Sequence, residues 1–166
     1  MNILKRVLTA FFTYCVKRNA ASCGKIRANR YCAVNSHTRI GDDCHFNGLK
    51  IYGQGDVSIG NNVHIAKGAQ FFTANHNYEG EKLPYDERVI VQPITIGDNV
   101  WIGADVTVLG GVTIGEGAII QAASCVVKDI PPCGIAGGHP AVVFKWRDKK
   151  HYEQLKNDNR TAQTHN

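Results

Sequence analysis

The stretch from Ile94 to Lys128 repeats every six residues, and this period restricts the fold more than any other feature of the chain. Each repeat contains a branched aliphatic residue with a small or branched companion two places before it. The aliphatic residues are Ile96, Ile102, Val108, Ile114, Ile120 and Val126, and the companions are Ile94, Val100, Val106, Val112, Ala118 and Ser124. A helix would show a period near 3.6, and a plain strand would show simple alternation. Alternation inside a six-residue period predicts an all-β solenoid, a parallel β-helix of very short strands.

Three six-residue faces make a coil of 18 residues, so each aliphatic residue should stack on the one 18 positions later, as Ile96 on Ile114. Weaker copies of the repeat come earlier in the chain. They lie at Val34, Ile40 and Phe46, and again at Ile59, Ile65 and Phe71. The step of thirteen residues from Phe46 to Ile59 predicts a one-residue insertion within residues 48–55.

The N-terminal segment, residues 1–22, is expected to form an amphipathic helix over residues 2–18, with Asn2 as its cap. Its apolar face combines Ile3, Val7, Phe11 and Tyr14 with Leu4, Leu8, Phe12 and Cys15. Two roles remain open for it. The helix can cover the open end of the solenoid, or it can lie weakly on a membrane surface through Phe11, Phe12 and the flanking basic residues.

The C-terminal boundary of the repeats is expected at Pro131, Pro132 and Pro140, because proline interrupts a β-ladder. The β-helix is therefore assigned to residues 23–144, with a loop over 77–93. Residues 145–166 are polar and predict a short helix followed by a tail.

Charge and cysteine usage exclude some functions. The net charge is +5, without a basic stripe interleaved with aromatic residues, so a nucleic-acid partner is not expected. The six cysteines include no Cys-x-x-Cys pair and no Cys/His cluster with zinc-ligand spacing. Reduced cysteines point to the cytoplasm, at the inner face of the membrane if the N-terminal helix binds lipid.

The long segment within residues 77–93 lacks the six-residue signal, and long loops of this kind usually carry function. His76 stands where this loop begins, in the outward phase that it shares with His45, His64 and Trp101. Three histidines in one phase raise the question of a metal. The three-histidine zinc site of γ-class carbonic anhydrases needs a close pair late in the repeats, and this chain has no histidine between His76 and His139. No metal is therefore expected.

Several separate blocks of this sequence resemble the hexapeptide-repeat acyltransferases. These blocks are FTANHNY, PITIGDNVWIGADV, GVTIGEGAIIQAASCVVKDIPP and GGHPA, the last where the family usually has GNPA. The nearest relatives are the maltose, galactoside and polysaccharide O-acetyltransferases, and the resemblance covers roughly residues 34–145. It implies a left-handed β-helix, acetyl-CoA as cosubstrate, and a homotrimer with active sites between subunits.

The resemblance implies that His76 is the general base. A neutral imidazole can take the proton of an acceptor hydroxyl near physiological pH, and the oxygen then attacks the thioester carbonyl without a covalent enzyme intermediate. Backbone N–H groups of Gly103 and Ala104 are candidate donors to the developing oxyanion. A bystander histidine and small residues that merely suit tight corners are the structural alternatives.

The resemblance also implies cosubstrate contacts, each with a structural alternative. Trp101 would wall the thioester tunnel or anchor an interface. Ala104 and Ala122 would approach the pantetheine arm, and Lys128 and Lys145 would neutralise phosphate of CoA. Val127 stands where the family commonly has threonine, and Val142 where it commonly has a basic residue. These two differences affect how the nucleotide end of CoA would be bound.

The resemblance implies that Asn47 orients the acceptor. The loop offers Asn75, Tyr85 and Arg88, with Asp86 and Glu87, as groups suited to hydrogen-bonding a sugar, and simple solvation of the surface explains these polar residues equally well. The function expected is transfer of acetyl from acetyl-CoA to a carbohydrate hydroxyl, as in surface-polysaccharide precursors. Acetylation of an antibiotic or of an amino-sugar nitrogen is the enzymatic alternative. A non-catalytic trimeric β-helix is the alternative from another class.

Overall fold

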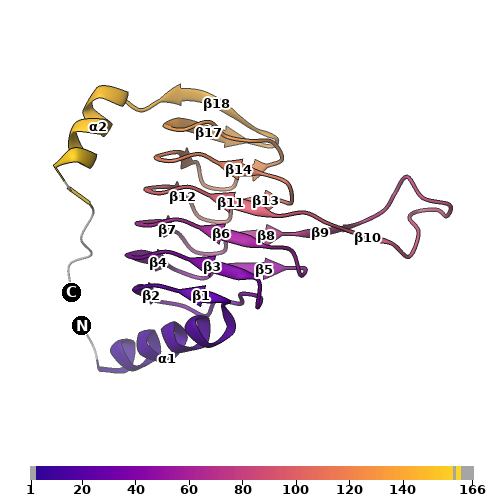
Figure 1. Ribbon diagram of the computed structural model, residues 1–166, viewed down its shortest axis with the longest axis horizontal. Helices are drawn as coiled ribbons and strands as arrows, with labels where there is room; N and C mark the ends of the chain where they lie inside the picture. Colours follow the sequence, from indigo (N-terminus) through magenta and orange to yellow (C-terminus); the bar gives the residue numbers. More distant parts are fainter. Residues whose placement is uncertain (1–2, 159, 162–166) are drawn as a thin grey trace.

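The six-residue repeats form stacked coils with a helix at each end of the stack (Figure 1). The computed structural model describes residues 3–158, 160 and 161, and it contains a parallel β-solenoid of about six turns. Each coil passes through three sheets, so the six-residue period corresponds to one face and the 18-residue period to one turn.

The three sheets are named here A, B and C in the order in which the chain visits them. Sheet A contains β1 (Ser22–Cys23), β3 (Thr38–Ile40), β6 (Val57–Ile59), β11 (Ile94–Ile96) and β14 (Thr113–Ile114). Sheet B contains β2 (Ile26–Ala28), β4 (Cys44–Phe46), β7 (His64–Ile65), β12 (Trp101–Ile102), β15 (Ile119–Ile120), β17 (Gly134–Gly138) and β18 (Ala141–Trp146). Sheet C contains β5 (Lys50–Tyr52), β8 (Gln70–Phe72), β13 (Thr107–Leu109) and β16 (Cys125–Val126).

The core consists of the aliphatic series and its companions. Ile96 pairs with Ile114 in sheet A, as the 18-residue period predicted, and the equivalent pairs form in sheets B and C. The inward side chains are almost completely buried, so burial of these stacked rows holds the coils together.

The backbone turns at three corners per coil, called A–B, B–C and C–A after the sheets they join. At corner A–B, Asn62 and Asn99 have φ of 52° and 58°, and the Asn62 side chain donates to Asn99 Oδ1 at 2.6 Å.

The first coil begins earlier than the visible repeats, because β1 and β2 pair with β3 and β4. The predicted irregularity lies within residues 48–55, where Leu49 and Ile51 are nevertheless buried. Gly53 turns the chain there with φ of 86°. The core therefore continues through the insertion, although the six-residue spacing does not.

The prediction that the prolines end the repeats is wrong for Pro131 and Pro132, whereas Pro140 does lie where the parallel coils end, because β18 after it pairs antiparallel with β17. Strand β17 pairs parallel with β15, and Ala136 stacks on Ile120 in the next coil. The turn containing Pro131 and Pro132 lies between Ile130 and Cys133, whose amides donate to the coil below at 2.9 and 2.8 Å. Proline is tolerated at these two positions because the ladder takes its donors from the residues on either side.

The segment between β8 and β11 is a β-hairpin that projects from corner C–A, away from the stacked coils (Figure 1). Its stem consists of β9 (Ala74–His76) and β10 (Val89–Val91), which pair antiparallel with His76 opposite Val89. His76 therefore does not lie on a coil in the outward phase of His64, as the spacing had indicated. The excursion begins at Ala74, because Thr73 is the last buried residue before it.

Helix α1 (Ile3–Asn19) covers the first coil, which confirms the capping position but not the face that was expected to pack. Val16 is buried, Phe12 is partly buried against the core, and the amide of Ala28 donates to Thr13 Oγ1 at 3.0 Å. Most of the apolar face predicted for the helix is exposed instead. Asn2, the predicted cap, lies outside the described residues. Within the described ranges, neither helix is long and apolar enough to cross a bilayer.

Helix α2 (Lys149–Asn157) confirms the predicted C-terminal helix and is capped by Asp148, whose side chain accepts from the amide of His151 at 3.0 Å. Tyr152 fixes this helix to corner A–B. Its hydroxyl donates to Glu116 Oε1 at 2.8 Å and accepts from Asn99 at 3.0 Å. The last five residues of the predicted tail lie outside the described part of the chain.

Candidate functional site

His76 is held on the stem of the hairpin by a ring contact with Tyr85. The two ring centroids lie 3.8 Å apart, and the planes are inclined by 13°. Tyr85 comes from the distal part of the hairpin, so the chain folds back on itself to make the contact. Both side chains remain exposed. The stacking fixes the plane of the imidazole while leaving its nitrogens accessible to a second molecule.

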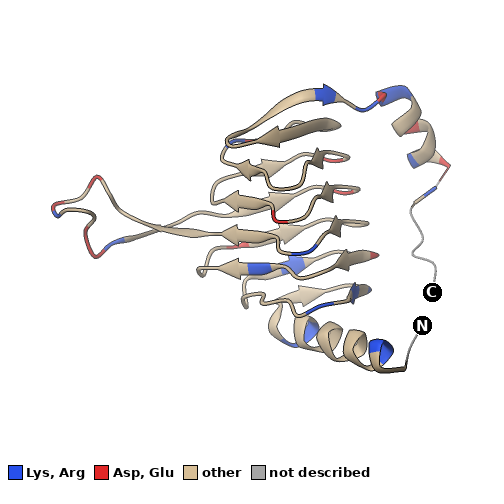
Figure 2. Cartoon of the chain, turned by 180° about the vertical axis from the view of Figure 1, so that it is seen from behind, with Lys and Arg blue, Asp and Glu red and all other residues tan. Residues whose placement is uncertain are grey.

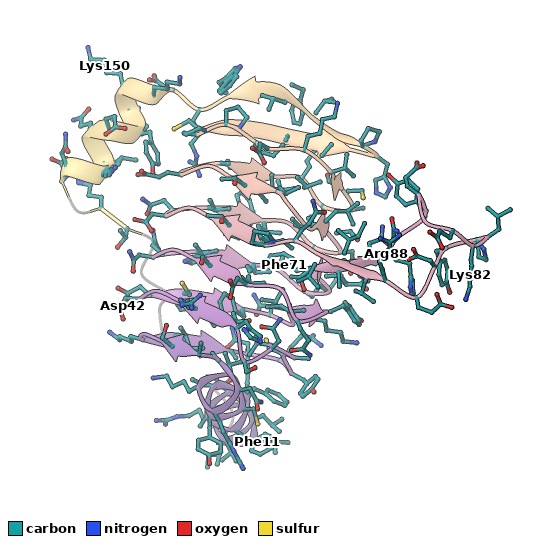
Figure 3. All side chains as sticks on the ribbon, turned by 45° about the vertical axis from the view of Figure 1, so that its right-hand side comes forward. Phe11, Asp42, Phe71, Lys82, Arg88 and Lys150 are labelled. Atoms are coloured by element: carbon teal, nitrogen blue, oxygen red, sulfur yellow. The ribbon has the colours of Figure 1, made fainter. Side chains whose placement is uncertain are left out.

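The fold of the hairpin tip depends on Asp86, whose side chain is only 8% exposed. The carboxylate accepts from the Arg88 amide at 2.9 Å, from Arg88 Nε at 2.8 Å and from the Asn77 side chain at 3.0 Å. These bonds, with that from the Arg88 side chain the largest contribution, lower the pKa of Asp86. Arg88, expected to contact the acceptor, is thus bound within the loop (Figure 3).

A hollow of about 350 Å³ lies at the root of the hairpin. It is lined by Phe72, Thr73, Ala74, Asn75, Ile90, Gln92, Thr107, Leu109, Gly110 and Val127. Asn75 is the predicted acceptor contact that lies in this lining. Gln92 and Thr107 were not singled out from the sequence, because Gln92 is one of many polar residues in the loop and Thr107 does not depart from the pattern of its repeat. The hollow combines apolar walls with a few polar groups, as small-molecule sites do.

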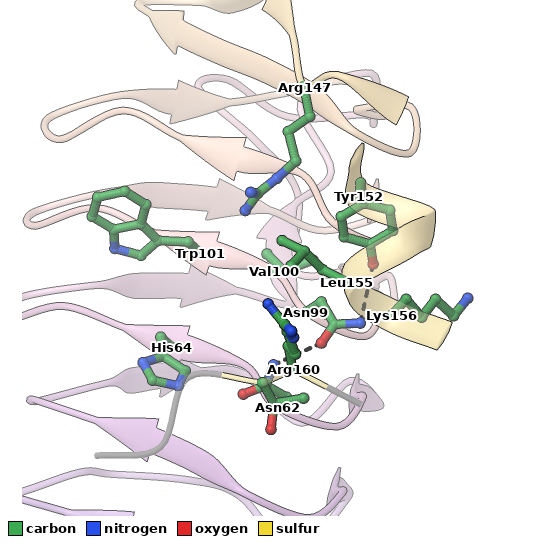
Figure 4. A pocket seen from close by; sticks show the side chains of 11 residues that line it. Asn62, His64, Asn99, Val100, Trp101, Arg147, Tyr152, Leu155, Lys156 and Arg160 are labelled. Carbon is green, nitrogen blue, oxygen red and sulfur yellow. Dashed lines mark hydrogen bonds between the residues drawn. The ribbon is translucent and has the colours of Figure 1, made fainter. Parts of the chain in front are cut away.

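A second groove, of about 450 Å³, lies between sheet B and α2 (Figure 4). Trp101 and His64 line it from the sheet, and Tyr152 and Leu155 line it from the helix. Arg147, Lys156 and Arg160 also line it, so the groove is cationic as well as apolar. These three cations were not singled out from the sequence, where they are scattered among other polar residues of the C-terminal segment.

His45 and His64 stack on neighbouring coils of sheet B, with ring centroids 4.7 Å apart. Both are half-buried rather than fully solvated. Burial lowers the pKa of each imidazole, and for His45 the neighbouring His64 lowers it further. Among the described residues, no group of three His, Cys, Asp or Glu side chains is placed to hold a metal ion.

The small residues predicted to meet CoA lie at corner B–C. Gly103 passes so close to the next coil that a β-carbon there would lie 2.5 Å from the amide nitrogen of Ala122. The Gly103 amide donates to the Ile120 carbonyl at 2.9 Å, so it cannot also serve an oxyanion. Ala104 remains the candidate donor of the two. Ala122 is exposed, so its surface is open to a ligand.

The remaining predicted contacts are distributed around the solenoid. Asn47 lies at corner B–C, where its side chain accepts from Asn29 at 3.1 Å. Lys145 lies on β18 opposite Ile135, in sheet B. Lys128 is exposed at corner C–A, directly after β16.

One chain therefore does not bring the predicted site together. Asn75, His76, Tyr85 and Arg88 belong to the hairpin at corner C–A, whereas Asn47, Gly103, Ala104 and Ala122 lie at corner B–C. Sheet C separates the two corners, and its strands of two or three residues span roughly 7–10 Å. The hairpin projects on the opposite side of the solenoid from α2 (Figure 1). The two groups of predicted residues therefore lie at different corners of one chain.

Comparisons with known proteins agree with this architecture. Residues 93–128 match the family model described as "Bacterial transferase hexapeptide (six repeats)". The chain is 40% identical over 126 residues to galactoside O-acetyltransferase of Escherichia coli strain K12, covering 74% of this chain and 62% of that protein. The chain thus spans about three fifths of the length of this curated relative.

Solved structures give the same result. A hexapeptide-repeat acetyltransferase of Vibrio cholerae O1 biovar eltor, solved with acetyl coenzyme A, superimposes with a TM-score of 0.73 at 28% identity, covering 86% of this chain and 82% of that one. A galactoside acetyltransferase solved with coenzyme A gives 0.70 at 29% identity, covering 90% and 82%. By its repeats, its fold and these comparisons, the chain is similar to the hexapeptide-repeat acetyltransferases.

Proposed function

We propose that this chain is an acetyl-CoA-dependent O-acetyltransferase that modifies a hydroxyl of a carbohydrate. The observation that carries the proposal is His76, an exposed imidazole held flat against Tyr85 on a hairpin that projects from the solenoid. A histidine of ordinary surface character would not need a second aromatic side chain to fix its plane. The likeness to proteins solved with acetyl coenzyme A supports the choice of cosubstrate.

The proposed chemistry is a direct transfer. His76 removes the proton of the acceptor hydroxyl, and the oxygen attacks the thioester carbonyl of acetyl-CoA. A C–O bond forms and the C–S bond breaks, so the products are the acetyl ester and CoA. The proton held by the imidazolium returns to the departing thiolate. Tyr85 acts through His76, because it sets the plane of the ring without reaching the reacting atoms.

The proposed active form is a homotrimer in which neighbouring chains share each site. Asn75 and His76 on the hairpin of one chain would meet corner B–C of the next, where Ala104 and Ala122 lie. A cyclic trimer uses a different surface on each side of its interface, so it can join residues that lie at different corners of one chain. The projecting hairpin supports this arrangement, because its stem extends beyond its own coils.

The cosubstrate would lie along corner B–C, with Ala104 and Ala122 beside the pantetheine arm. Trp101, 55% exposed on sheet B, would wall this path. Lys128 and Lys145 would place positive charge near the phosphates. The free thiols of all six cysteines support a reducing compartment, and we propose the cytoplasm.

Release of free thiol from acetyl-CoA, followed with a thiol reagent across a panel of sugars, tests the proposal. We expect turnover with a carbohydrate acceptor and a loss of about 10²–10⁴-fold in His76→Ala. His37→Ala is the matched control, because His37 is also exposed but lies on the solenoid. An unaffected His76→Ala variant would refute the assignment of the base. No thiol release with any acceptor would favour a non-catalytic β-helix, and release only with amines or an antibiotic would change the acceptor class.

A further inference from the structure

Helix α1 has two distinct faces, and only one of them packs on the solenoid. Thr9, Phe12, Thr13 and Val16 recur at helical spacing and lie toward the first coil. At about 100° per residue, the residues between them point away from it. This second face consists of Ile3, Leu4, Val7, Leu8, Phe11 and Tyr14. Their exposed fractions run from 42% for Leu8 to 78% for Ile3.

The exposed face is larger and more apolar than the face that caps the coil. Six large apolar side chains on one side of a single helix form a contiguous stripe, not the scattered surface residues that need no explanation. The capping function does not require them, because the cap is made by the opposite side. Figure 3 shows Phe11 at this free end of the molecule, beyond the first coil.

The charges on α1 have one sign. The helix carries Lys5, Arg6, Lys17 and Arg18 and no aspartate or glutamate, whereas the rest of the chain carries fifteen cations against fourteen acids. Cations further from the helix are paired, since Lys25 lies 3.9 Å from Asp43 and Arg39 lies 3.6 Å from Asp56. Figure 2 shows basic but no acidic residues on α1. This end of the molecule is therefore complementary to a surface that is apolar inside and anionic outside.

The position of α1 leaves its exposed apolar face accessible to a flat surface. The helix lies across the end of the stack, below β1 and β2, and no other helix or strand of the described residues lies beyond it (Figure 1). In the proposed cyclic trimer, the three copies of α1 would lie at one height along the symmetry axis and could contact one plane together.

We propose that α1 binds the surface of an anionic lipid bilayer while its other face caps the solenoid. Leu4, Leu8 and Phe11 enter the boundary between headgroups and acyl chains, and the basic residues of the helix contact lipid phosphate. The helix lies in the plane of the interface. The two roles that the sequence left as alternatives are compatible, because they use opposite faces of the same helix.

Sedimentation of the full-length protein with lipid vesicles tests this inference without any acetyl transfer, so its outcome is independent of the proposed enzyme activity. The vesicles contain phosphatidylcholine alone or a mixture with phosphatidylglycerol. We expect binding to the anionic vesicles that weakens as salt is added. The double variant Leu8→Ser, Phe11→Ser should bind these vesicles more weakly than the wild type by at least about tenfold.

Two further variants make the result specific. Leu83→Ser, Tyr78→Ser on the hairpin is the matched control, because these side chains are 95% and 67% exposed, and its binding should equal that of the wild type. Lys17→Glu, Arg18→Glu should weaken binding to the anionic vesicles by about tenfold or more. Thermal melting should be unchanged in each variant, since only exposed side chains differ.

Three results would overturn the proposal. The first is no binding to anionic vesicles at low salt. The second is binding that the Leu8→Ser, Phe11→Ser variant leaves unchanged. In the third, light scattering shows that this variant forms a smaller assembly than the wild type, and the wild type binds no lipid. That result would identify the face as a contact between copies of this chain.

Discussion

Two inactive variants of this chain should restore activity to each other when they assemble together. His76→Ala removes the proposed base from the hairpin. Ala122→Trp fills the proposed cosubstrate path at corner B–C, where the alanine is exposed and a larger side chain leaves the core untouched. Each homotrimer should be inactive by itself, because every one of its sites contains the same defect.

The expected recovery follows from how the half-sites are divided between chains. In a cyclic trimer, each site would take its hairpin from one chain and its corner from the next. Whichever variant is present twice, about one in three sites of a mixed trimer receives an intact hairpin and an intact corner, so mixed trimers should show about one third of the wild-type activity. If one chain supplied both halves, every site would carry one defect and no activity would return.

Trimers that contain both variants can be isolated by giving each variant a different affinity tag and purifying on both tags in sequence. Thiol release from acetyl-CoA is then compared with that of wild-type trimers carrying the same two tags. Purification on both tags shows that the chains have mixed, so a failure of exchange cannot mimic a negative result. Activity no higher than that of the two separate homotrimers would refute the shared site, even if His76 is confirmed as the base.

Further predictions concern stability and pH. Ile102→Ala should lower the free energy of unfolding by about 2–5 kcal/mol in urea titrations, because the side chain is fully buried between neighbouring coils; a change below about 1 kcal/mol would contradict the stacking. Tyr152→Phe should cost about 1 kcal/mol and increase proteolysis of α2, since it removes the hydroxyl's bonds to Glu116 and Asn99; unchanged proteolysis would argue against this anchor. Because the folded state lowers the pKa of His45 and His64, it binds protons more weakly than the unfolded chain, so stability should fall as pH drops below about 6.5. Urea midpoints at neutral and acidic pH check this, and replacing both histidines with asparagine should reduce the histidine contribution to that pH dependence.

The candidate site shows which structural features could be predicted from local sequence and which could not. The loop could be located because the period stops, and His76 because it stands at that break. The hairpin stem could not be predicted, since β9 and β10 are short and join through pairing between residues about fifteen positions apart. The burial of Asp86 and its bonds to Arg88 and Asn77 likewise depend on how the tip folds back. The bond from Arg88 to Asp86 therefore could not be predicted, and a contact between Arg88 and the acceptor stays a prediction.

The sequence by itself determined the solenoid, its three faces and the stacking of Ile96 on Ile114, because each follows from a period that every coil repeats. Only the tertiary structure decided what the irregular parts do. It showed that Pro131 and Pro132 lie in a turn that needs no amide donor, and that the Gly103 amide is already bound. It also showed which face of α1 packs on the first coil. A periodic pattern reports which side chains are buried, whereas the partners of an isolated residue depend on segments far away in the chain.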